Sequence, residues 1–600
     1  MTTPSPWPQY SRSMPSLLFE RSGKWADQTV FRAKIGGTWT DITWRELEEK
    51  SLAVAAGLLH LGMRKRSVAA ILSHNRPDWA YVDFGCQMAD VISAPIYPTN
   101  TADQVAYILR NSESEIVFLE DEAQLAKVEK SRDQLPTLRK AIITDGGEDG
   151  DFVMRLDTLM NLGRQHMDRA AIDARWQAID PEEVATLIYT SGTTGNPKGV
   201  MLCHRNLVSN VYAVQDFLTM RAGDSDLQFL PMCHSFGRME VYVFMMHEGT
   251  VTFAESVAKI PDNLKEIRPT IFVTVPRLLE KVYEKIQADL AASSPSKRKI
   301  FAWALSVGGR ILEDRQARRP SKFLDTLQYK LADKLVFKKI KAALGGNIRV
   351  LAFGAAPLAV DIQRFFASTG ILAMEAYGLS ETSPGLTGNK ESFFRLGSAG
   401  LPLPGTDVKI AEDGEILVRG PQVMNGYWKL PAETAEALQD GWFHTGDIGR
   451  LDEDGFLWIT DRKKDIIITA GGKNVAPQNI ENQLKLDPAI EQVAVIGDKK
   501  KYLVALIVPA WPWFEDFAEQ KGLSGTREEM LADPKVLTEF ETRLARFNEG
   551  LAQYETIKRF ALLAEEFSIE NNMLTPTMKV RRKTVYGNYA KLIESLYADA

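Results

Sequence analysis

One short loop concentrates the residue types that bind phosphate. Residues 189–199 read Tyr-Thr-Ser-Gly-Thr-Thr-Gly-Asn-Pro-Lys-Gly and follow an apolar run that is typical of a buried strand. The glycines let backbone N–H groups approach a polyanion without a Cβ clash. The hydroxyls add donors, and the lysine adds a positive charge. The predicted phosphate-binding residues are Thr190, Ser191, Gly192, Thr193, Thr194, Gly195 and Lys198.

This loop differs from a Walker A motif. That motif needs glycine directly before its lysine and Ser or Thr after it. Here Lys198 lies between Pro197 and Gly199. A plain surface turn is the other interpretation, but four hydroxyls, three glycines and a lysine in one loop favour phosphate binding.

Three later segments carry residues suited to a purine nucleotide. Tyr377, in Tyr-Gly-Leu-Ser-Glu-Thr, offers an aromatic face to a base, and Glu381 is a hard oxygen ligand for Mg²⁺. The small residues 354–358, Gly-Ala-Ala-Pro-Leu, allow a flat base to pack on the backbone. Asp447 can accept both hydroxyls of a ribose, as acidic residues do in dinucleotide sites. Taken singly, each could instead be a core aromatic, a surface carboxylate or a helix cap.

In this order, the segments resemble the motifs of the adenylate-forming superfamily, which includes acyl-CoA synthetases, luciferases and peptide-synthetase adenylation domains. The resemblance extends from about Trp44 to Arg582. It implies ATP as a substrate and Mg²⁺ as a cofactor held by Glu381 and Thr190. It also implies catalytic roles for Thr190, Lys198, Glu381 and Lys579. The implied adenine and ribose contacts are Gly354, Ala355, Ala356, Glu375, Ala376, Tyr377, Gly378, Thr382, Asp447 and Arg462.

The resemblance continues toward the C-terminus with one departure. Residues 461–465, Asp-Arg-Lys-Lys-Asp, match the family's hinge motif, with Lys464 as the pivot, and Gly471 and Gly472 would line the path of the coenzyme A thiol. The family's Gly-Lys signature is replaced by Met578 followed by Lys579. This form is similar to that of long-chain fatty acyl-CoA synthetases. A basic, solvated tail is the other interpretation of this segment.

Residues 229–240 resemble the segment that lines the acyl pocket of long-chain enzymes. The resemblance implies that His234 approaches the substrate carboxylate and that Phe236 gates the acyl tunnel, although His234 is equally typical of a hydrogen-bonded core imidazole. The implied function is ATP-dependent activation of a long-chain fatty acid through an acyl-adenylate to acyl-CoA, with release of pyrophosphate and AMP. Two alternatives stay open: a fatty acyl-AMP ligase that passes its acyl group to a carrier protein, and a non-catalytic nucleotide- or lipid-binding protein.

Short apolar runs separated by helical patterns fill residues 65–480. Bounded by Gly, Ser or Pro, such runs predict buried strands of α/β sheets. Past residue 400, alternating strands predict a small β-rich subdomain, followed by a strand–helix–strand–strand order. We therefore predict an α/β fold: a large N-terminal lobe (1–462) of two α/β sheet subdomains plus a small β-rich subdomain (about 400–460). A smaller, mobile α+β C-terminal domain (463–600) would follow a hinge near 461–465.

Composition and charge exclude several classes. With 45% hydrophobic residues, 25% charged residues and a net charge of −6, the chain reads as globular and gives no sign of a nucleic-acid partner. Three separated cysteines, a polar N-terminus and no long apolar run predict a cytoplasmic protein without a spanning helix. Nothing in the sequence indicates its oligomeric state.

One region departs from the acidic average. Residues 297–341 hold thirteen Lys or Arg and four Asp or Glu. Within them Phe323, Leu327, Leu331 and Leu335 recur every four residues, as on one helix face. Two interpretations are open: a helix that packs this stripe and solvates a basic face, or a basic surface in peripheral contact with the inner face of an anionic membrane.

Overall fold

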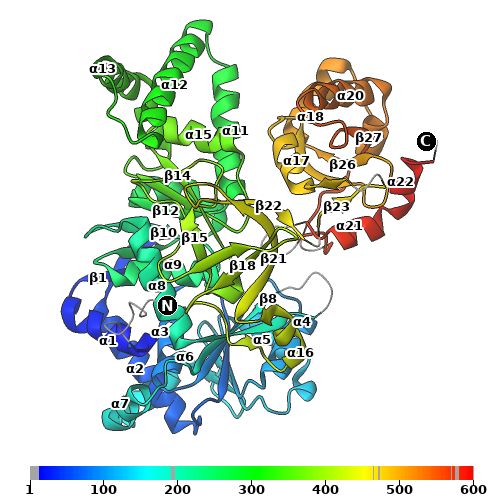
Figure 1. The fold of residues 1–600 in the computed structure, drawn as a ribbon. Helices are drawn as coiled ribbons and strands as arrows, with labels where there is room; N and C mark the ends of the chain where they lie inside the picture. The colour runs from blue at the N-terminus through cyan, green and yellow to red at the C-terminus, as the bar shows by residue number, and fades with distance from the viewer. Residues whose placement is uncertain are drawn as a thin grey trace.

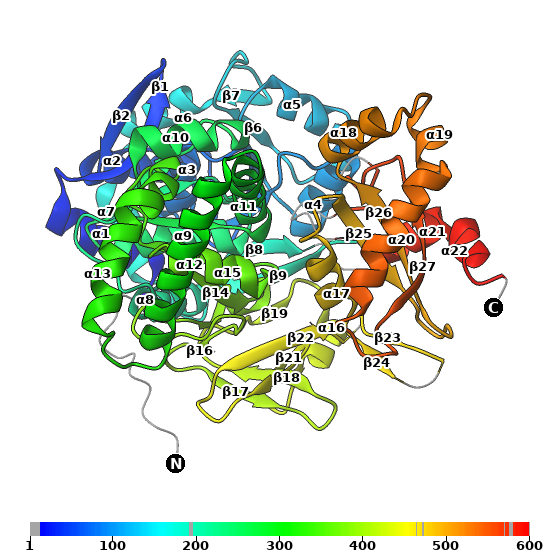
Figure 2. The same cartoon turned by 90° about the horizontal axis from the view of Figure 1, so that it is seen from above.

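The computed structural model describes residues 12–190, 196–463, 465–470, 473–568, 571–574 and 580–598. An N-terminal lobe of several sheets occupies the lower and left parts of Figure 1, and a smaller C-terminal domain, coloured orange to red, stands beside it. The view from above separates the same two parts (Figure 2). The predicted α/β class is confirmed.

The largest sheet has eight strands in the order β19-β9-β8-β4-β3-β5-β6-β7. Strands β3 and β4 are buried along their whole length, which explains their continuous apolar sequences. Its strands are β3 (Val68–Leu72), β4 (Ile92–Ile96), β5 (Ile116–Leu119), β6 (Lys140–Ile143), β7 (Val153–Arg155), β8 (Val184–Thr190), β9 (Lys198–Cys203) and β19 (Gly426–Tyr427). The helices of this part are α2 (Trp44–His60), α3 (Pro77–Met88), α4 (Ala102–Ser112), α5 (Glu122–Glu129), α6 (Leu156–Gln165) and α7 (Arg169–Gln177).

A second sheet has the order β12-β13-β14-β15-β16, with its first three strands parallel. Its strands are β12 (Ile271–Thr274), β13 (Val350–Phe353), β14 (Leu372–Gly378), β15 (Gly385–Gly388) and β16 (Leu401–Pro402). Its helices are α10 (Ile260–Ile267), α11 (Pro276–Ala291), α12 (Pro295–Gln316), α13 (Phe323–Ala332), α14 (Lys338–Ala343) and α15 (Val360–Ser368). Helices α12 and α13 form a hairpin that projects at the upper left of Figure 1.

A four-stranded sheet, β10-β11-β1-β2, was not predicted. In this sheet β1 (Thr29–Ile35) forms an antiparallel hairpin with β2 (Thr38–Thr43). On its other side β1 pairs with β11 (Thr250–Phe253), and β11 pairs in turn with β10 (Ser225–Gln228). Because β1 pairs with residues more than 200 positions away, local patterning does not reveal this sheet. The helices α1 (Met14–Trp25), α8 (His204–Leu218) and α9 (Ser235–Met246) lie in the same part of the lobe.

The β-rich segment follows, with order β17-β18-β21-β20 and with β22 on β21. Its elements are β17 (Asp407–Ile410), β18 (Glu415–Arg419), α16 (Pro431–Ala437), β20 (Leu438–Gln439), β21 (Trp442–Leu451) and β22 (Leu457–Arg462). The short pair β23 (Ile467–Ile468) and β24 (Asn474–Val475) comes next.

The C-terminal domain is built on a three-stranded sheet, β25-β26-β27. Alternate residues of β26 point to two separate cores, Leu503 and Ala505 to one and Val504 and Leu506 to the other, as strand geometry requires. Helices therefore cover both faces. The elements are α17 (Pro477–Leu484), β25 (Ile490–Ile496), β26 (Leu503–Pro509), α18 (Trp511–Lys521), α19 (Arg527–Leu531), α20 (Pro534–Asn548), β27 (Ile557–Leu562), α21 (Arg582–Asn588) and α22 (Ala590–Ser595).

Candidate active site

The base of the predicted phosphate loop is a hairpin. Strands β8 and β9 are antiparallel, and Thr190 is the cross-strand partner of Lys198. The Lys198 Nζ lies 5.0 Å from the ring centroid of Tyr427, a cation–π distance. The loop residues Ser191, Gly192, Thr193, Thr194 and Gly195 lie outside the described residues. The described part thus sets a hydroxyl and an ammonium side by side where the loop begins and ends.

Tyr427 connects this hairpin to the predicted metal ligand. Its hydroxyl donates a hydrogen bond of 2.9 Å to Oε1 of Glu381, which lies on the 3-10 turn Ser380–Thr382. Burial and the nearby Glu381 raise the pKa of Tyr427, so the phenol keeps its proton. The sequence analysis missed Tyr427, because only the pairing of β19 with β9 brings it here.

A second group gathers around Asp447, the predicted ribose ligand. The Tyr377 hydroxyl donates to Oδ2 of this buried carboxylate at 2.5 Å, and the Arg462 Nε lies 3.3 Å from its Oδ1. Asp447 and Arg462 are cross-strand partners on β21 and β22. Burial and the neighbouring Asp447 raise the pKa of Tyr377 well above its usual value. Three residues predicted from separate segments therefore meet at one point.

The small residues after β13 pack closely against β14 and the start of α9. A Cβ on Gly354 would lie 2.9 Å from the carbonyl oxygen of Ala376 and 3.5 Å from Cε1 of Phe236. Ala355 follows in the left-handed region, at φ 68°. At Gly378 a Cβ would lie 1.7 Å from the carbonyl oxygen of Pro384, so only glycine fits there. Gly354, in the predicted base-binding segment, is therefore packed against Phe236, the predicted acyl gate.

Glu375 and Thr382, which the resemblance assigned to nucleotide binding, have their polar atoms engaged inside the protein. Oε2 of Glu375 accepts a 3.3 Å bond from Gln363, and burial raises the pKa of this carboxyl to about 8. The Thr382 hydroxyl donates to the carbonyl of Pro384 at 2.6 Å. Their side chains brace the strand and turn that carry Tyr377 and Glu381.

The predicted acyl-binding residues begin helix α9. His234 is its N-cap, and its Nδ1 accepts a 3.1 Å bond from the backbone N–H of Phe236. The Ser235 hydroxyl lies 3.3 Å from that of Ser380, beside Glu381. The start of α9 therefore adjoins the turn that carries the predicted metal ligand.

A buried polar network anchors α9 to the main sheet. Arg238 is almost fully buried, forms an ion pair with Asp83 of α3 and donates to the Tyr242 hydroxyl at 2.7 Å. It also donates to Thr186 of β8 at 2.7 Å and to Ser93 of β4 at 2.9 Å. The sequence analysis missed this network, since its members lie in four separate elements.

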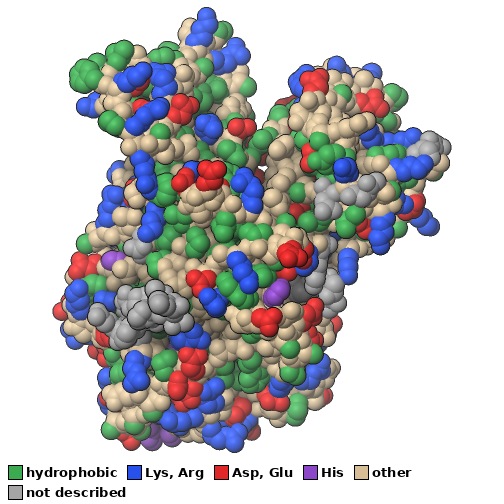
Figure 3. All heavy atoms as spheres, in the orientation of Figure 1, with side chains coloured by type: hydrophobic (Ala, Val, Ile, Leu, Met, Phe, Trp, Pro, Cys, Tyr) green, Lys and Arg blue, Asp and Glu red, His purple; other side chains and the backbone are tan. Residues whose placement is uncertain are grey.

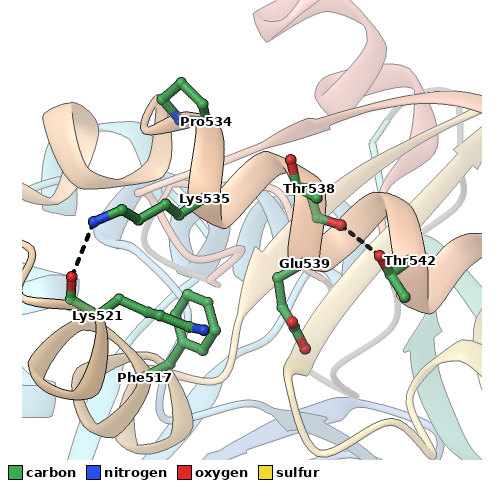
Figure 4. Close-up of a pocket in the computed structure, with 7 residues that line it drawn as sticks. All are labelled: Phe517, Lys521, Pro534, Lys535, Thr538, Glu539 and Thr542. Atoms are coloured by element: carbon green, nitrogen blue, oxygen red, sulfur yellow. Dashed lines mark hydrogen bonds between the residues drawn. The ribbon is translucent and has the colours of Figure 1, made fainter.

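Other predicted residues cannot be placed. Lys464, Gly471, Gly472 and Lys579 lie outside the described residues. A hollow between α18 and α20 of the C-terminal domain shares no residue with the groups above (Figure 4). Its lining residues are Phe517, Lys521, Pro534, Lys535, Thr538, Glu539 and Thr542.

Replacing Asp447 by asparagine is expected to raise the KM for ATP at least about tenfold, since hydrogen bonds to charged groups contribute about 1.5–3 kcal/mol. The amide keeps the size of the side chain but loses its charge beside Arg462. Initial rates of pyrophosphate release at varied ATP measure the effect. Tyr377→Phe, which removes one donor and leaves the carboxylate, serves as the control and should change KM less; an unchanged KM in Asp447→Asn would contradict the assignment.

The fold and these groups define a nucleotide-binding enzyme of the adenylate-forming type. A family model described as AMP-binding enzyme matches residues 18–428, and one described as AMP-binding enzyme C-terminal domain matches residues 464–600. The chain belongs to the AMP-binding enzyme family.

Named relatives resemble nearly the whole chain. It is 37% identical to the long-chain-fatty-acid–CoA ligase FadD15 of Mycobacterium bovis, covering 97% of this chain and 96% of that protein. It is 35% identical to the long-chain-fatty-acid–CoA ligase ACSBG2 of Xenopus laevis, covering 97% and 83%. Among solved structures, the adenylation domain of a carboxylate reductase from Mycobacterium chelonae superposes with a TM-score of 0.78 at 21% identity, covering 98% and 91%. The last comparison concerns the fold alone.

Proposed function

We propose that this protein is a long-chain fatty-acid–CoA ligase. It joins a fatty acid to AMP, with release of pyrophosphate, and then transfers the acyl group to coenzyme A, with release of AMP. The observation that carries the proposal is a series of contacts between the predicted phosphate hairpin, metal ligand and acyl segment. Tyr427 contacts both Lys198 and Glu381, and Ser380, next to Glu381, lies 3.3 Å from Ser235 at the start of α9. Two relatives with this activity in their names match almost the full length.

The first step needs charge neutralisation and alignment rather than a protein nucleophile. A carboxylate oxygen of the fatty acid attacks the α-phosphorus of ATP, and the bond to pyrophosphate breaks. We assign Lys198, Lys579 and the Thr190 hydroxyl to the developing charge on the phosphates. Asp447 and Arg462 hold the ribose, which fixes the nucleotide.

Glu381 suits a Mg²⁺ ion, with Thr190 as the second proposed ligand. Mg²⁺ takes most of its ligands from phosphate oxygens and water and one or two from protein carboxylates. Glu381 offers a carboxylate whose orientation the Tyr427 hydroxyl fixes. When bound there, the ion would neutralise the pyrophosphate leaving group.

The second step uses the C-terminal domain, which we propose to extend over residues 463–600. The coenzyme A sulfur attacks the acyl carbonyl carbon of the adenylate, and the bond to AMP breaks. We propose that Lys464 is the pivot of the hinge at 461–465 and that Gly471 and Gly472 line the path of the thiol. Reorientation of domains between steps is a common way to complete a second site.

We propose a cytoplasmic location with peripheral membrane contact through residues 297–341. ATP and coenzyme A are cytoplasmic substrates, and the three cysteines are buried free thiols. In the part of the chain that the structure describes, no helix has the length and apolarity to cross a bilayer.

Incubation with ATP, Mg²⁺ and palmitate is expected to release pyrophosphate, and added coenzyme A should yield palmitoyl-CoA and AMP. The measurements are coupled pyrophosphate detection and chromatography of the acyl products. Omission of coenzyme A should leave enzyme-bound acyl-AMP. Palmitoyl-AMP that coenzyme A does not consume would instead favour the acyl-AMP ligase. If no pyrophosphate is released, the proposal that this protein activates fatty acids with ATP is wrong.

A further inference from the structure

Helix α13 and the segment after it have two different faces. On the inner face Ala332, Val336, Phe337 and Ile340 are buried in the core that the second sheet shares with its helices. The Tyr329 ring packs on that of Phe337, with ring centroids 5.5 Å apart. This inner face accounts for how the hairpin is held to the protein.

The outer face is apolar and open to solvent. Phe323 is 85% exposed, Leu324 62%, Leu327 55%, Leu331 50% and Leu335 47%. In the described part of the chain, eight large apolar side chains are at least 47% exposed, and five of these eight lie within residues 323–335. Single exposed leucines are ordinary, whereas a contiguous patch marks an interaction surface. Of the two interpretations of this stripe, the exposure contradicts the one in which it packs inside the protein.

Positive charge borders this outer face. Lys330 follows Leu327 by three residues, which places the two on the same side of α13, and Lys334 lies in the helical segment Asp333–Phe337 that directly follows α13. Both are exposed, and no described residue forms a salt bridge with either. Figure 3 shows hydrophobic side chains gathered over α13 at the upper left, next to blue ones.

The acidic groups of the hairpin do not cancel this charge, because local arginines and a lysine already pair with three of them. Asp325 pairs with Arg310 at 2.8 Å and Asp333 with Lys341 at 2.7 Å. Asp314 likewise pairs with Arg319 at 2.6 Å. The unpaired charge beside the apolar face is thus mainly that of the lysines.

We infer that the outer face of α13 docks on an anionic lipid bilayer, with its leucines in the headgroup boundary and its lysines against lipid phosphates. Apolar side chains flanked by lysines are what an interfacial helix requires. A second copy of the chain fits less well, since pairing two such faces would bring like charges together. The inference deepens the proposed membrane contact and does not depend on the ligase reaction.

Flotation of the full-length protein with vesicles tests this docking. Wild type should float with phosphatidylcholine vesicles that contain phosphatidylglycerol, less so at high salt, and weakly with phosphatidylcholine alone. Lys330→Glu/Lys334→Glu should reduce binding at least about 25-fold, because each basic residue near an anionic surface contributes about fivefold. Leu327→Ser/Leu331→Ser should also reduce binding, through loss of the inserted apolar surface.

Matched controls lie elsewhere on the surface. Lys558→Glu/Lys591→Glu makes the same charge change on exposed lysines of the C-terminal domain, and Val257→Ser removes an exposed apolar side chain. These variants should float like wild type. Circular dichroism and pyrophosphate release with dissolved fatty acid should be unchanged in all variants that fold, which separates this inference from the proposed reaction.

Three results would overturn the inference. The first is flotation of the lysine or leucine variants equal to that of wild type. The second is equal binding of wild type to neutral and anionic vesicles. The third is a dimer, seen by sedimentation velocity, that dissociates in the leucine variant without any lipid binding by wild type; the face would then join two copies.

Discussion

Replacing Glu381 by glutamine is expected to lower kcat/KM for pyrophosphate release by about 100-fold, the upper end of losses seen when groups around a metal site are altered. The amide can still accept the hydrogen bond from Tyr427, so the turn at Ser380–Thr382 should keep its shape. What the variant loses is the negative charge that suits Mg²⁺. Initial rates with ATP and palmitate at several Mg²⁺ concentrations measure the effect, and higher Mg²⁺ should restore part of the rate.

Tyr427→Phe is the matched control for this prediction. It removes the donor to Glu381 and keeps both the ring beside Lys198 and the carboxylate. We expect a smaller loss than in Glu381→Gln, because the carboxylate and its negative charge remain. A Glu381→Gln rate within a factor of two of wild type would contradict the metal-ligand role and show that Glu381 acts only through its contact with Tyr427, which the amide keeps.

Much of the fold was predictable because buried strands have a simple signature. The apolar runs at 184–189 and 372–376 correspond to β8 and β14, since strands covered on both faces have no polar side to alternate with. The run at 415–419 corresponds to β18 at the same bounds, but residues 415–418 are all buried, so the expected alternation of buried and exposed residues was wrong. The resemblance then placed Thr190, Lys198, Tyr377 and Asp447 on or next to such strands.

Pairings between distant segments could not be predicted in the same way. Tyr427 reaches Lys198 only through the pairing of β19 with β9. Likewise, the period of four in the stripe that begins at Phe323 indicates an apolar helix face but not what covers it. Burial is a property of the assembled lobe, and the fold exposes that face.

Breaking the buried ion pair of Asp83 and Arg238 is expected to destabilise the N-terminal lobe. Asp83→Leu is expected to lower the free energy of unfolding of the N-terminal lobe by about 3–5 kcal/mol, because it leaves a buried guanidinium without its carboxylate. Urea unfolding measured by tryptophan fluorescence suits this test, since the Arg238 guanidinium lies 5.3 Å from the buried Trp79 ring. A loss below about 1 kcal/mol would mean that Tyr242 and its neighbours suffice for the charge.

The double variant Asp83→Leu/Arg238→Met separates the charge from the packing. Removing both charges should recover most of the lost stability, since an apolar pair of similar volume often replaces a buried ion pair without cost. Function should not recover to the same extent. Arg238 also bonds Thr186 on β8, four residues before Thr190, and its helix begins beside His234. If the network aligns β8 with α9, the double variant should have the unfolding free energy of wild type but a raised KM for both ATP and fatty acid. Wild-type KM values would show that the network contributes to stability alone.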